Sequence, residues 1–504
     1  MTGALLGGLA LVLLAGTGAL VAATLQVRRV GEFVLAAYVV AYGSMVALCL
    51  LLSVFGAMTR FALIGGSAAI LLGSVVVWLS LGARRPPRFS FATARVVTGR
   101  GPVLLLVTVV ALALSYVVAL ILGTPPNGSD QLNYHLPRAA FWLESDRVGY
   151  VRDAYDQRIN SFAPNGEIGV TFALDVTRNE IFAAFVQFAA ALACGVGVFA
   201  LARRLRLGRA EAAFGGLLFL SLPIVLLQAA STKNDVVLAS FLVAAAVFLL
   251  GQDRAHVGLA GLATALAVGT KFTAFYGLVL LVLLALLAPP RRQRSLRLAA
   301  VGVGTAVGLY WYVLNIVETR KFLGDTSAFH GLTSVLHLRE NLYSLVGLAV
   351  DSIDLSGARG ADILFFPVAA LLVAACLAAM AVRSRSPEWS RIALAAALVA
   401  TPLLLYLLAV DVGRPALVRV LHFLGNPPAY VPPNGNPTLS PTLASDTGSW
   451  FGPVGFLLVW VIVESLFFTV FGGVLTKLIQ NYAHTRVNKL FGFIPSTINA
   501  LLFF

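Results

Sequence analysis

Charged residues are scarce in this chain of 504 residues, at 12% of the sequence. A globular domain carries about 25% charged residues, so there are too few charges here to cover a water-facing surface. Hydrophobic residues make up 59% of the chain. They come in unbroken runs, several longer than the roughly 18 residues typical of a membrane span, without the alternation of a barrel strand. The sequence therefore predicts an all-α, polytopic transmembrane helix bundle.

Cysteine and the common catalytic motifs are also nearly missing. The three cysteines, Cys49, Cys194 and Cys376, all fall in apolar runs without paired spacing, which disfavours a disulfide framework or a zinc site. The chain has no Walker loop, no HExxH and no GxSxG motif, so an ATP-driven pump is not expected. The net charge is +14, but the basic residues form short tracts beside apolar runs, as topology signals do. We expect no nucleic-acid partner.

The apolar runs divide into about thirteen spans by the rule that a span needs about 20 residues. The expected spans are residues 3–25, 33–56, 61–83, 102–122, 180–202, 212–230, 234–251, 255–269, 272–288, 298–318, 361–382, 391–411 and 451–476.

Arginine gives the orientation. Arg28 and Arg29 and the tracts 84–100, 203–209, 291–297 and 383–391 all fall on one face of this arrangement, which is then the cytoplasmic face. Three loops, 123–179, 319–360 and 412–450, lie on the other face and hold most of the acidic residues. We therefore expect a multi-pass protein of the cell membrane, with short interfacial helices in its outer loops and an active site on the extracytoplasmic face.

The first outer loop carries the most informative pattern. Asp130, Tyr134 and Arg138 are spaced i, i+4 and i+8, so they share one face of a helix, and His135 lies beside that face. An acid, an imidazole and a guanidinium at the membrane boundary suit removal of a hydroxyl proton next to a bound phosphate. The same residues also fit a solvated loop in which Asp130 merely caps a helix that begins at Gln131.

Further polar residues stand at other span boundaries. Glu167 follows Pro164-Asn165-Gly166, Lys233-Asn234-Asp235 precedes one span, and Lys271 separates two more. Lysines at such positions can bind a lipid phosphate, and carboxylates can hold a divalent metal or orient a sugar. The structural alternative is an ordinary helix cap at Asn234 or Asp235, with a lysine reaching to the interface.

Taken in order, these segments resemble the GT-C superfamily of integral-membrane glycosyltransferases, in particular the bacterial relatives of dolichyl-phosphate-mannose protein mannosyltransferases. The segments that carry the resemblance are Ser129-Asp130-Gln131-Leu132-Asn133-Tyr134-His135-Leu136-Pro137, Ala163-Pro164-Asn165-Gly166-Glu167, Lys233-Asn234-Asp235, Gly269-Thr270-Lys271-Phe272-Thr273-Ala274 and Trp311-Tyr312-Val313-Leu314-Asn315. Thr319-Arg320-Lys321-Phe322 departs from the Thr-Gly-Asn-Pro element of that family.

The resemblance implies transfer of a sugar, with inversion, from a polyprenyl-phosphate donor to a hydroxyl of a glycan, lipid or protein. It implies Asp130 as the catalytic base and the other polar residues as ligands of the substrates. The expected donor-phosphate ligands are Lys233, Lys271, Arg138 and His135, and the expected sugar or acceptor ligands are Tyr134, Asn165, Glu167, Asn234, Asp235 and Asn315. Glu167 and Asp235 are also the candidate ligands of a divalent metal.

On this interpretation the chain has three parts. Residues 1–100 are additional N-terminal spans, residues 101–410 are the glycosyltransferase core with catalytic loop 123–179, and residues 411–504 are an outer loop with one or more C-terminal spans and no clear soluble domain.

The main alternative function is that of a transporter or lipid flippase, which needs polar residues near the middle of several spans. A non-catalytic scaffold is the third alternative. The depth of the ionisable groups in the membrane distinguishes the glycosyltransferase from the transporter: a site at the outer boundary favours the enzyme, and a site near the midplane favours the transporter.

Overall fold

The computed structural model describes residues 2–88 and 101–325. The chain divides into two compact units, Met1–Ser334 and Val335–Phe504, and the described residues all lie in the first. The expected spans 361–382, 391–411 and 451–476, the loop 412–450, the tract 383–391 and most of the loop 319–360 are outside the described residues.

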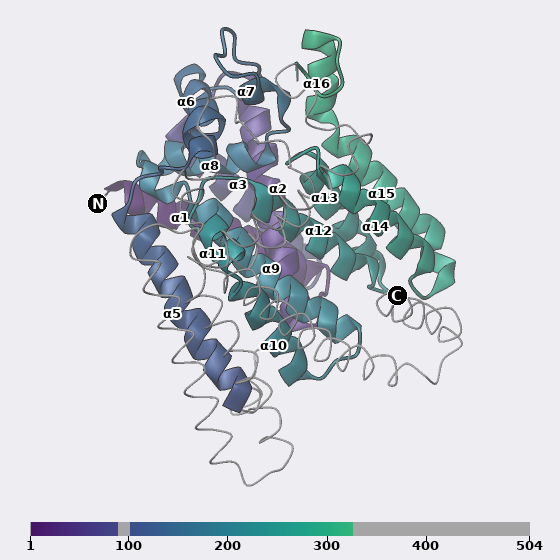
Figure 1. The fold of residues 1–504 in the computed structure, drawn as a ribbon. Helices are drawn as coiled ribbons and strands as arrows, with labels where there is room; N and C mark the ends of the chain where they lie inside the picture. The colour runs from purple at the N-terminus through teal and green to yellow at the C-terminus, as the bar shows by residue number, and fades with distance from the viewer. Residues whose placement is uncertain (1, 89–100, 326–504) are drawn as a thin grey trace, which may run out of the picture. The chain divides into compact units, whose positions relative to one another are not determined.

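Every regular element in the described ranges is a helix (Figure 1). The helices are α1 (Thr2–Thr24), α2 (Val30–Val54), α3 (Arg60–Ser80), α5 (Gly101–Gly123), η1 (Gln131–His135), α6 (Leu136–Ser145), α7 (Arg158–Ser161), α8 (Asn165–Thr177), η2 (Glu180–Phe182), α9 (Phe185–Arg204), α10 (Arg209–Leu220), α11 (Pro223–Ala229), α12 (Asp235–Leu249), α13 (Arg254–Val268), α14 (Ala274–Leu287), η3 (Arg291–Gln293), α15 (Arg294–Gly308) and α16 (Tyr310–Thr319).

Five of these helices are long and apolar enough to cross a membrane, namely α1, α2, α3, α5 and α9. The pair α15 and α16 would make a sixth span, bent by 40° at Leu309. The predicted all-α polytopic class is therefore confirmed. Helices α12, α13 and α14 are apolar but have only 15, 15 and 14 residues, fewer than the roughly 20 that an untilted span needs.

The expected span 212–230 is two helices instead of one. Helix α10 ends at Leu220, and α11 starts at Pro223. Proline has no backbone N–H to donate and disfavours helical geometry in the residue before it, so it interrupts a helix but starts one well.

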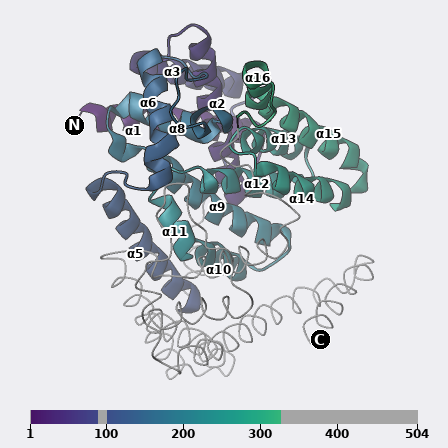
Figure 2. The same cartoon turned by 45° about the horizontal axis from the view of Figure 1, so that its top comes forward.

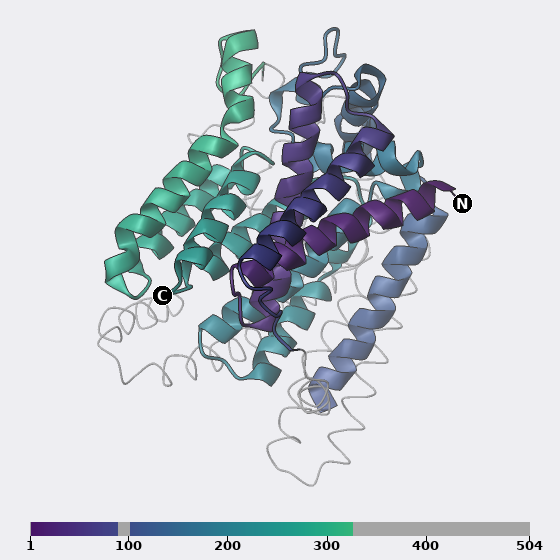
Figure 3. The same ribbon diagram turned by 180° about the vertical axis from the view of Figure 1, so that it is seen from behind.

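The three N-terminal helices pack on one another, with α1 against both α2 and α3, as Figure 3 shows from behind. Helix α2 also packs against α9, α12 and α13. Two side-chain contacts secure this packing: the Tyr38 hydroxyl lies 2.8 Å from that of Ser240, and the Tyr42 hydroxyl donates to the Asn165 carbonyl at 2.9 Å. Residues 1–88 are thus joined to the rest of the unit through α2, and α1, α2 and α3 all pack against α8 as well.

The rest of the unit is a set of neighbouring helices in which α13 packs against α12 and α15, and α14 packs against α12 and α15 (Figure 2). Small residues allow α13 and α15 to approach closely. A Cβ on Gly308 would come within 2.6 Å of the Ala265 carbonyl oxygen. Gly304 and Gly308 form a GxxxG pair of the kind that brings membrane helices together.

The helices bring the arginine-rich segments to one end. Glu32, near the start of α2, lies 2.7 Å from Arg204 at the end of α9 and 3.1 Å from His256 at the start of α13. Arg297, near the start of α15, donates to the Gly251 carbonyl beyond the end of α12. Because α12 ends where α13 and α15 begin, the start of α12 and the end of α13 lie at the opposite end. We call these the arginine end and the site end.

Candidate active site

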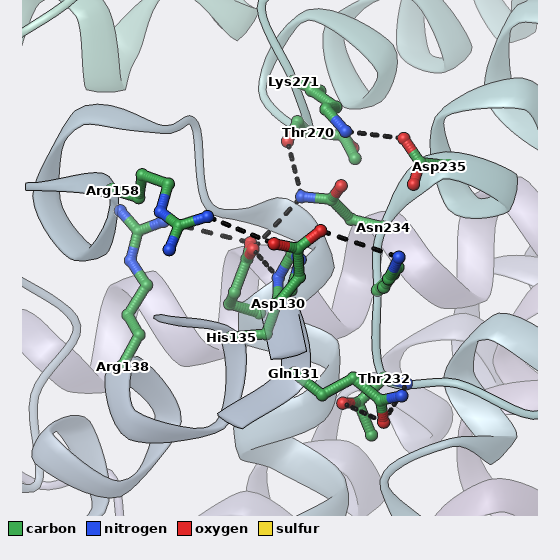
Figure 4. Close-up of polar contacts among 12 residues, drawn as sticks. Asp130, Gln131, His135, Arg138, Arg158, Thr232, Asn234, Asp235, Thr270 and Lys271 are labelled. Atoms are coloured by element: carbon green, nitrogen blue, oxygen red, sulfur yellow. Dashed lines mark hydrogen bonds and ion pairs between the residues drawn. The ribbon is translucent and has the colours of Figure 1, made fainter. Parts of the chain in front are cut away.

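Asp130 stands at the site end, seven residues after α5, at the N-cap position directly before η1. Its carboxylate makes no capping hydrogen bond, so the simple cap does not describe it. Instead it lies 3.1 Å from the Arg158 guanidinium and 3.6 Å from the Lys233 ammonium (Figure 4). Its side chain is 39% exposed. Asp130 is therefore an accessible carboxylate between two cations that come from separate parts of the chain.

The segment after Asp130 begins with a π-helical turn, Gln131–His135, and continues as α6. Such turns change the direction of the following side chains and are frequent at functional sites. Gln131 accepts hydrogen bonds from the Thr232 N–H at 3.2 Å and from its hydroxyl at 3.1 Å. This contact holds η1 against the loop that carries Lys233.

Glu167, in the first turn of α8, is buried, with 1% of its surface exposed. Its Oε1 accepts from His135 Nδ1 at 2.6 Å and from the Asn234 amide at 3.1 Å. Its Oε2 lies 4.0 Å from Arg138. Burial alone would raise the pKa of Glu167, but the hydrogen bond from His135 and the charges of His135 and Arg138 outweigh burial and lower it. Glu167 is therefore an ionised group in a network that spans α6, α8 and the start of α12.

Arg138 is enclosed, with no exposed surface. Its guanidinium carbon lies 4.8 Å from the centre of the Trp142 ring and 4.7 Å from that of Trp311. Its three nitrogens have no hydrogen-bond partner among the described residues. Burial lowers the pKa of Arg138 to about 10, so it stays charged at neutral pH. In this structure a donor phosphate could not reach Arg138 without a rearrangement of the tryptophans.

The two predicted phosphate lysines lie at the site end, each beside a carboxylate. Lys271 lies 2.5 Å from Asp235, whose side chain is 45% exposed, and Lys233 lies 3.6 Å from Asp130. The loop before α12 approaches α8 closely: a Cβ placed on Gly166 would come within 2.6 Å of the Asn234 Cβ. The structure thus brings together Asp130, Lys233, Asp235 and Lys271, which are separated by up to 141 residues in the numbering.

Two of the three predicted asparagine ligands, Asn165 and Asn315, are buried and fully engaged. Asn165 donates to the Leu266 carbonyl at 3.0 Å and accepts from the Tyr310 hydroxyl at 2.8 Å. Asn315 donates to the Ser161 carbonyl at 2.9 Å and accepts from the Tyr150 hydroxyl at 2.8 Å. Their side chains join α8 to α13 and α16 to the outer loop, behind the accessible surface.

The model of glycosyltransferase family 87 matches residues 172–409, slightly less than half of the chain. This family is one of the membrane glycosyltransferases of the GT-C type. This match supports a membrane glycosyltransferase of the GT-C type. The matched range starts after Asp130 and Glu167 and includes Lys233, Asp235 and Lys271. No curated protein and no solved structure matches the chain.

The candidate site also contains an arginine that the sequence did not indicate. Arg158, in the short helix α7, lies 3.1 Å from Asp130 and 2.7 Å from Asp156, and its guanidinium covers the Tyr134 ring at 4.5 Å. Tyr134 itself is 4% exposed. The sequence does not show that Arg158 lies near Asp130, because the loop between them has no helical or strand periodicity. The only local signal for a functional role of Arg158 is the neighbouring acid Asp156.

The candidate metal ligands Glu167 and Asp235 do not form a suitable donor set. In the ranges 2–88 and 101–325, no group of three or more His, Cys, Asp or Glu side chains could hold a metal ion. Glu167 Oε1 already accepts two hydrogen bonds, and its Oε2 faces the positive charge of Arg138, which would repel a cation. Asp235 is paired with Lys271. We therefore derive no catalytic step through a metal.

Proposed function

We propose that this glycosyltransferase takes its sugar from a polyprenyl-phosphate donor and transfers it to an acceptor hydroxyl, with Asp130 as the base. The observation that carries the proposal is the accessible Asp130 carboxylate with Arg158 and Lys233 at 3.1 and 3.6 Å. A base beside fixed cations can accept a proton while the cations stabilise the charge of a departing phosphate.

The proposed reaction is a single inverting displacement. The acceptor oxygen forms a bond to the anomeric carbon of the sugar and gives its proton to Asp130. The bond from the anomeric carbon to the donor phosphate breaks, and the electron pair leaves with that phosphate. Because a phosphate leaving group needs no proton, one accessible carboxylate is enough.

We propose Lys233 and Lys271 as the ligands of the donor phosphate, since their side chains are 30% and 18% exposed. A bound phosphate would compete with Asp130 and Asp235 for these ammonium groups and would leave the carboxylates free for the acceptor and the sugar. Arg138 and His135, also expected at the phosphate, are buried. We propose that they do not contact the phosphate and influence it only electrostatically, as part of the charged network around Glu167.

Among the expected sugar and acceptor ligands, we propose direct contact for Asp235, the most exposed of them. Tyr134, Asn165, Glu167, Asn234 and Asn315 are all buried and hydrogen-bonded or stacked. For these residues we propose that they hold the loops around Asp130 in position.

The position of the cluster favours this function over a transporter or flippase. Asp130, Lys233 and Lys271 all lie between helices at the site end, close to helix termini. A transporter needs its ionisable groups near the middle of spans, at broken helices. Gln187, a polar residue inside α9, hydrogen-bonds to Gln228 and Ser231 and is accounted for by packing.

We expect Lys233→Ala and Lys271→Ala each to weaken use of a polyprenyl-phosphate donor by about 10- to 150-fold, because a hydrogen bond to a charged group contributes roughly 1.5–3 kcal/mol. The measurement is transfer of labelled sugar by purified protein over a range of donor concentrations. Lys321→Ala is the matched control, since Lys321 is 55% exposed and pairs only with Asp325 among the described residues. A Lys233→Ala protein that uses the donor as the unmodified protein does would contradict the phosphate assignment. Absence of transfer from this donor by the unmodified protein would contradict the donor class.

We propose that the site end is extracytoplasmic and the arginine end cytoplasmic. In a Cys376→Ser background, Ser145→Cys is expected to react with a membrane-impermeant maleimide added to intact cells, and Ser295→Cys only after permeabilisation. Both serines are exposed, Ser145 at the site end and Ser295 in the first turn of α15 at the arginine end, while Cys49 and Cys194 are buried. Labelling of Ser295→Cys alone in intact cells would invert the orientation.

A further inference from the structure

A cavity of about 310 Å³ opens at the arginine end, away from the candidate active site. It lies between the α1–α2 connection and the segment that follows α3, and its lining residues are Gln26, Val27, Arg28, Arg84, Arg85 and Pro87. The volume reaches the lower end of the range of roughly 300–1,000 Å³ that small-molecule sites occupy. The lining has no carboxylate.

Two backbone turns flank this cavity. Gln26 follows α1 with a φ of 57°, and Gly82 and Ala83 follow α3 with φ values of 89° and 48°. The Trp78 indole donates to the Arg84 carbonyl at 2.8 Å, and Arg84 donates to the Thr24 carbonyl at 3.3 Å. These contacts tie the chain after α3 to the end of α1.

The cations in the cavity are not neutralised by the protein. Among the described residues, Arg28 and Arg85 have neither an ion pair nor a side-chain hydrogen bond, and Arg84 bonds only to uncharged groups. Three guanidinium groups that converge on one cavity repel one another, and this cost is removed when an anion binds between them. Guanidinium groups bind phosphate in a planar, bidentate geometry.

The cavity is also at the level of a lipid headgroup. It lies at the ends of α1, α2 and α3, which are all apolar enough to span a membrane. The last turns of α3 expose Val76, Val77 and Leu79, as a surface in contact with acyl chains would. Trp78, between them, is of the type that concentrates at membrane interfaces.

We propose that this cavity binds the phosphate headgroup of an anionic membrane lipid. The lipid enters from the side of α3, its phosphate accepts hydrogen bonds from Arg28 and Arg85, and its acyl chains lie along the apolar face of α3. Basic pockets between membrane helices bind anionic headgroups in this manner. The site is independent of the transfer reaction, and it assigns a role to the N-terminal helices that precede the catalytic loop.

The test uses the full chain purified in an uncharged detergent. A phosphatidylglycerol with a fluorescent acyl chain is titrated into the unmodified protein, and phosphatidylcholine with the same label is the zwitterionic comparison. We expect saturable binding of phosphatidylglycerol and about tenfold or greater weakening in Arg28→Gln/Arg85→Gln, which removes two charge-assisted bonds. Arg28→Lys/Arg85→Lys keeps the charge and should retain most of the binding.

The matched control is Arg291→Gln/Arg292→Gln, which removes two exposed arginines from η3 without touching the cavity. This variant should bind phosphatidylglycerol as the unmodified protein does. Equal weakening in both glutamine variants would mean diffuse attraction to the basic end and would overturn the proposal. So would equal affinity for phosphatidylcholine, or displacement of the lipid by inorganic phosphate at comparable concentration, which would make the ligand a soluble phosphate. Because Arg28 and Arg85 bond to no other described residue, the thermal unfolding of their variants should be unchanged.

Discussion

Asp130→Asn is expected to lower the rate of sugar transfer by about 10²–10⁴, the usual contribution of a general base. The amide keeps the shape of the carboxylate, but it cannot accept a proton from the acceptor hydroxyl. The measurement is transfer by purified protein with the donor at saturation, so that the loss appears in kcat. The fold should not change, because the Asp130 side chain is 39% exposed and makes no helix cap.

Asp153→Asn is the matched control for this experiment. Asp153 is an exposed carboxylate in the same loop, and its φ of 57° is one that asparagine adopts readily. We expect near-normal transfer from it. If Asp130→Asn also transfers at a near-normal rate, the base lies elsewhere and Asp130 serves only to pair with Arg158 and Lys233.

Glu167→Gln is expected to destabilise the protein by roughly 3–5 kcal/mol, the usual effect of removing one partner from a buried ion pair. The substitution leaves Arg138 charged and enclosed between Trp142 and Trp311, with no anion beside it. The measurement is thermal or denaturant unfolding of purified protein. The double substitution Arg138→Met/Glu167→Gln removes both charges and should recover part of the lost stability, since the effects of substitutions at two interacting residues do not add.

The effect of Glu167 should also depend on pH. Its pKa is lowered in the folded protein from an ordinary value of 4.5. The stabilisation from its ionised form is therefore complete above that ordinary value, and it is lost as the pH falls through the lower folded pKa. Unfolding of the unmodified protein should show this acid loss, and Glu167→Gln should lack it. Equal stability of the two proteins at all pH values would show that the network around Glu167 does not contribute to folding.

Much of the fold could be predicted from the sequence, because membrane helices are long apolar segments whose signal is local. Helices α1, α2, α3, α5 and α9 lie close to where the apolar runs predicted them. The break before α11 was missed, although Pro223 is a local signal for it. The apolar runs that contain α12, α13 and α14 are each long enough to predict a span. The helices themselves are shorter than these runs, because the length of an apolar run does not show where the helix within it begins and ends.

The candidate site was only partly predictable, because it forms from segments that meet through tertiary contacts. The sequence indicates Asp130, Lys233 and Lys271 as candidate site residues, because each stands beside an apolar run. Their proximity to one another was not visible, and neither was the pairing of Asp130 with Arg158. Arg138 is expected as a phosphate ligand, because the sequence does not show that it is enclosed. Trp142 follows it by one helical turn on α6, but no local pattern reveals that the remote Trp311 covers its other side.

The hydrogen bond from Tyr42 to the Asn165 carbonyl has a consequence for comparisons between related chains. Asn165 is the first residue of α8, and Glu167 follows two positions later, so α2 helps to fix the origin of the helix that carries the buried carboxylate. A homologue that begins at α5 would lose the donor to that carbonyl together with the aromatic packing of Tyr42 on Phe241. Such a homologue is expected to cover this end of α8 with side chains from another helix or a second chain. The N-terminal helices and the region around α8 are therefore expected to change together during evolution.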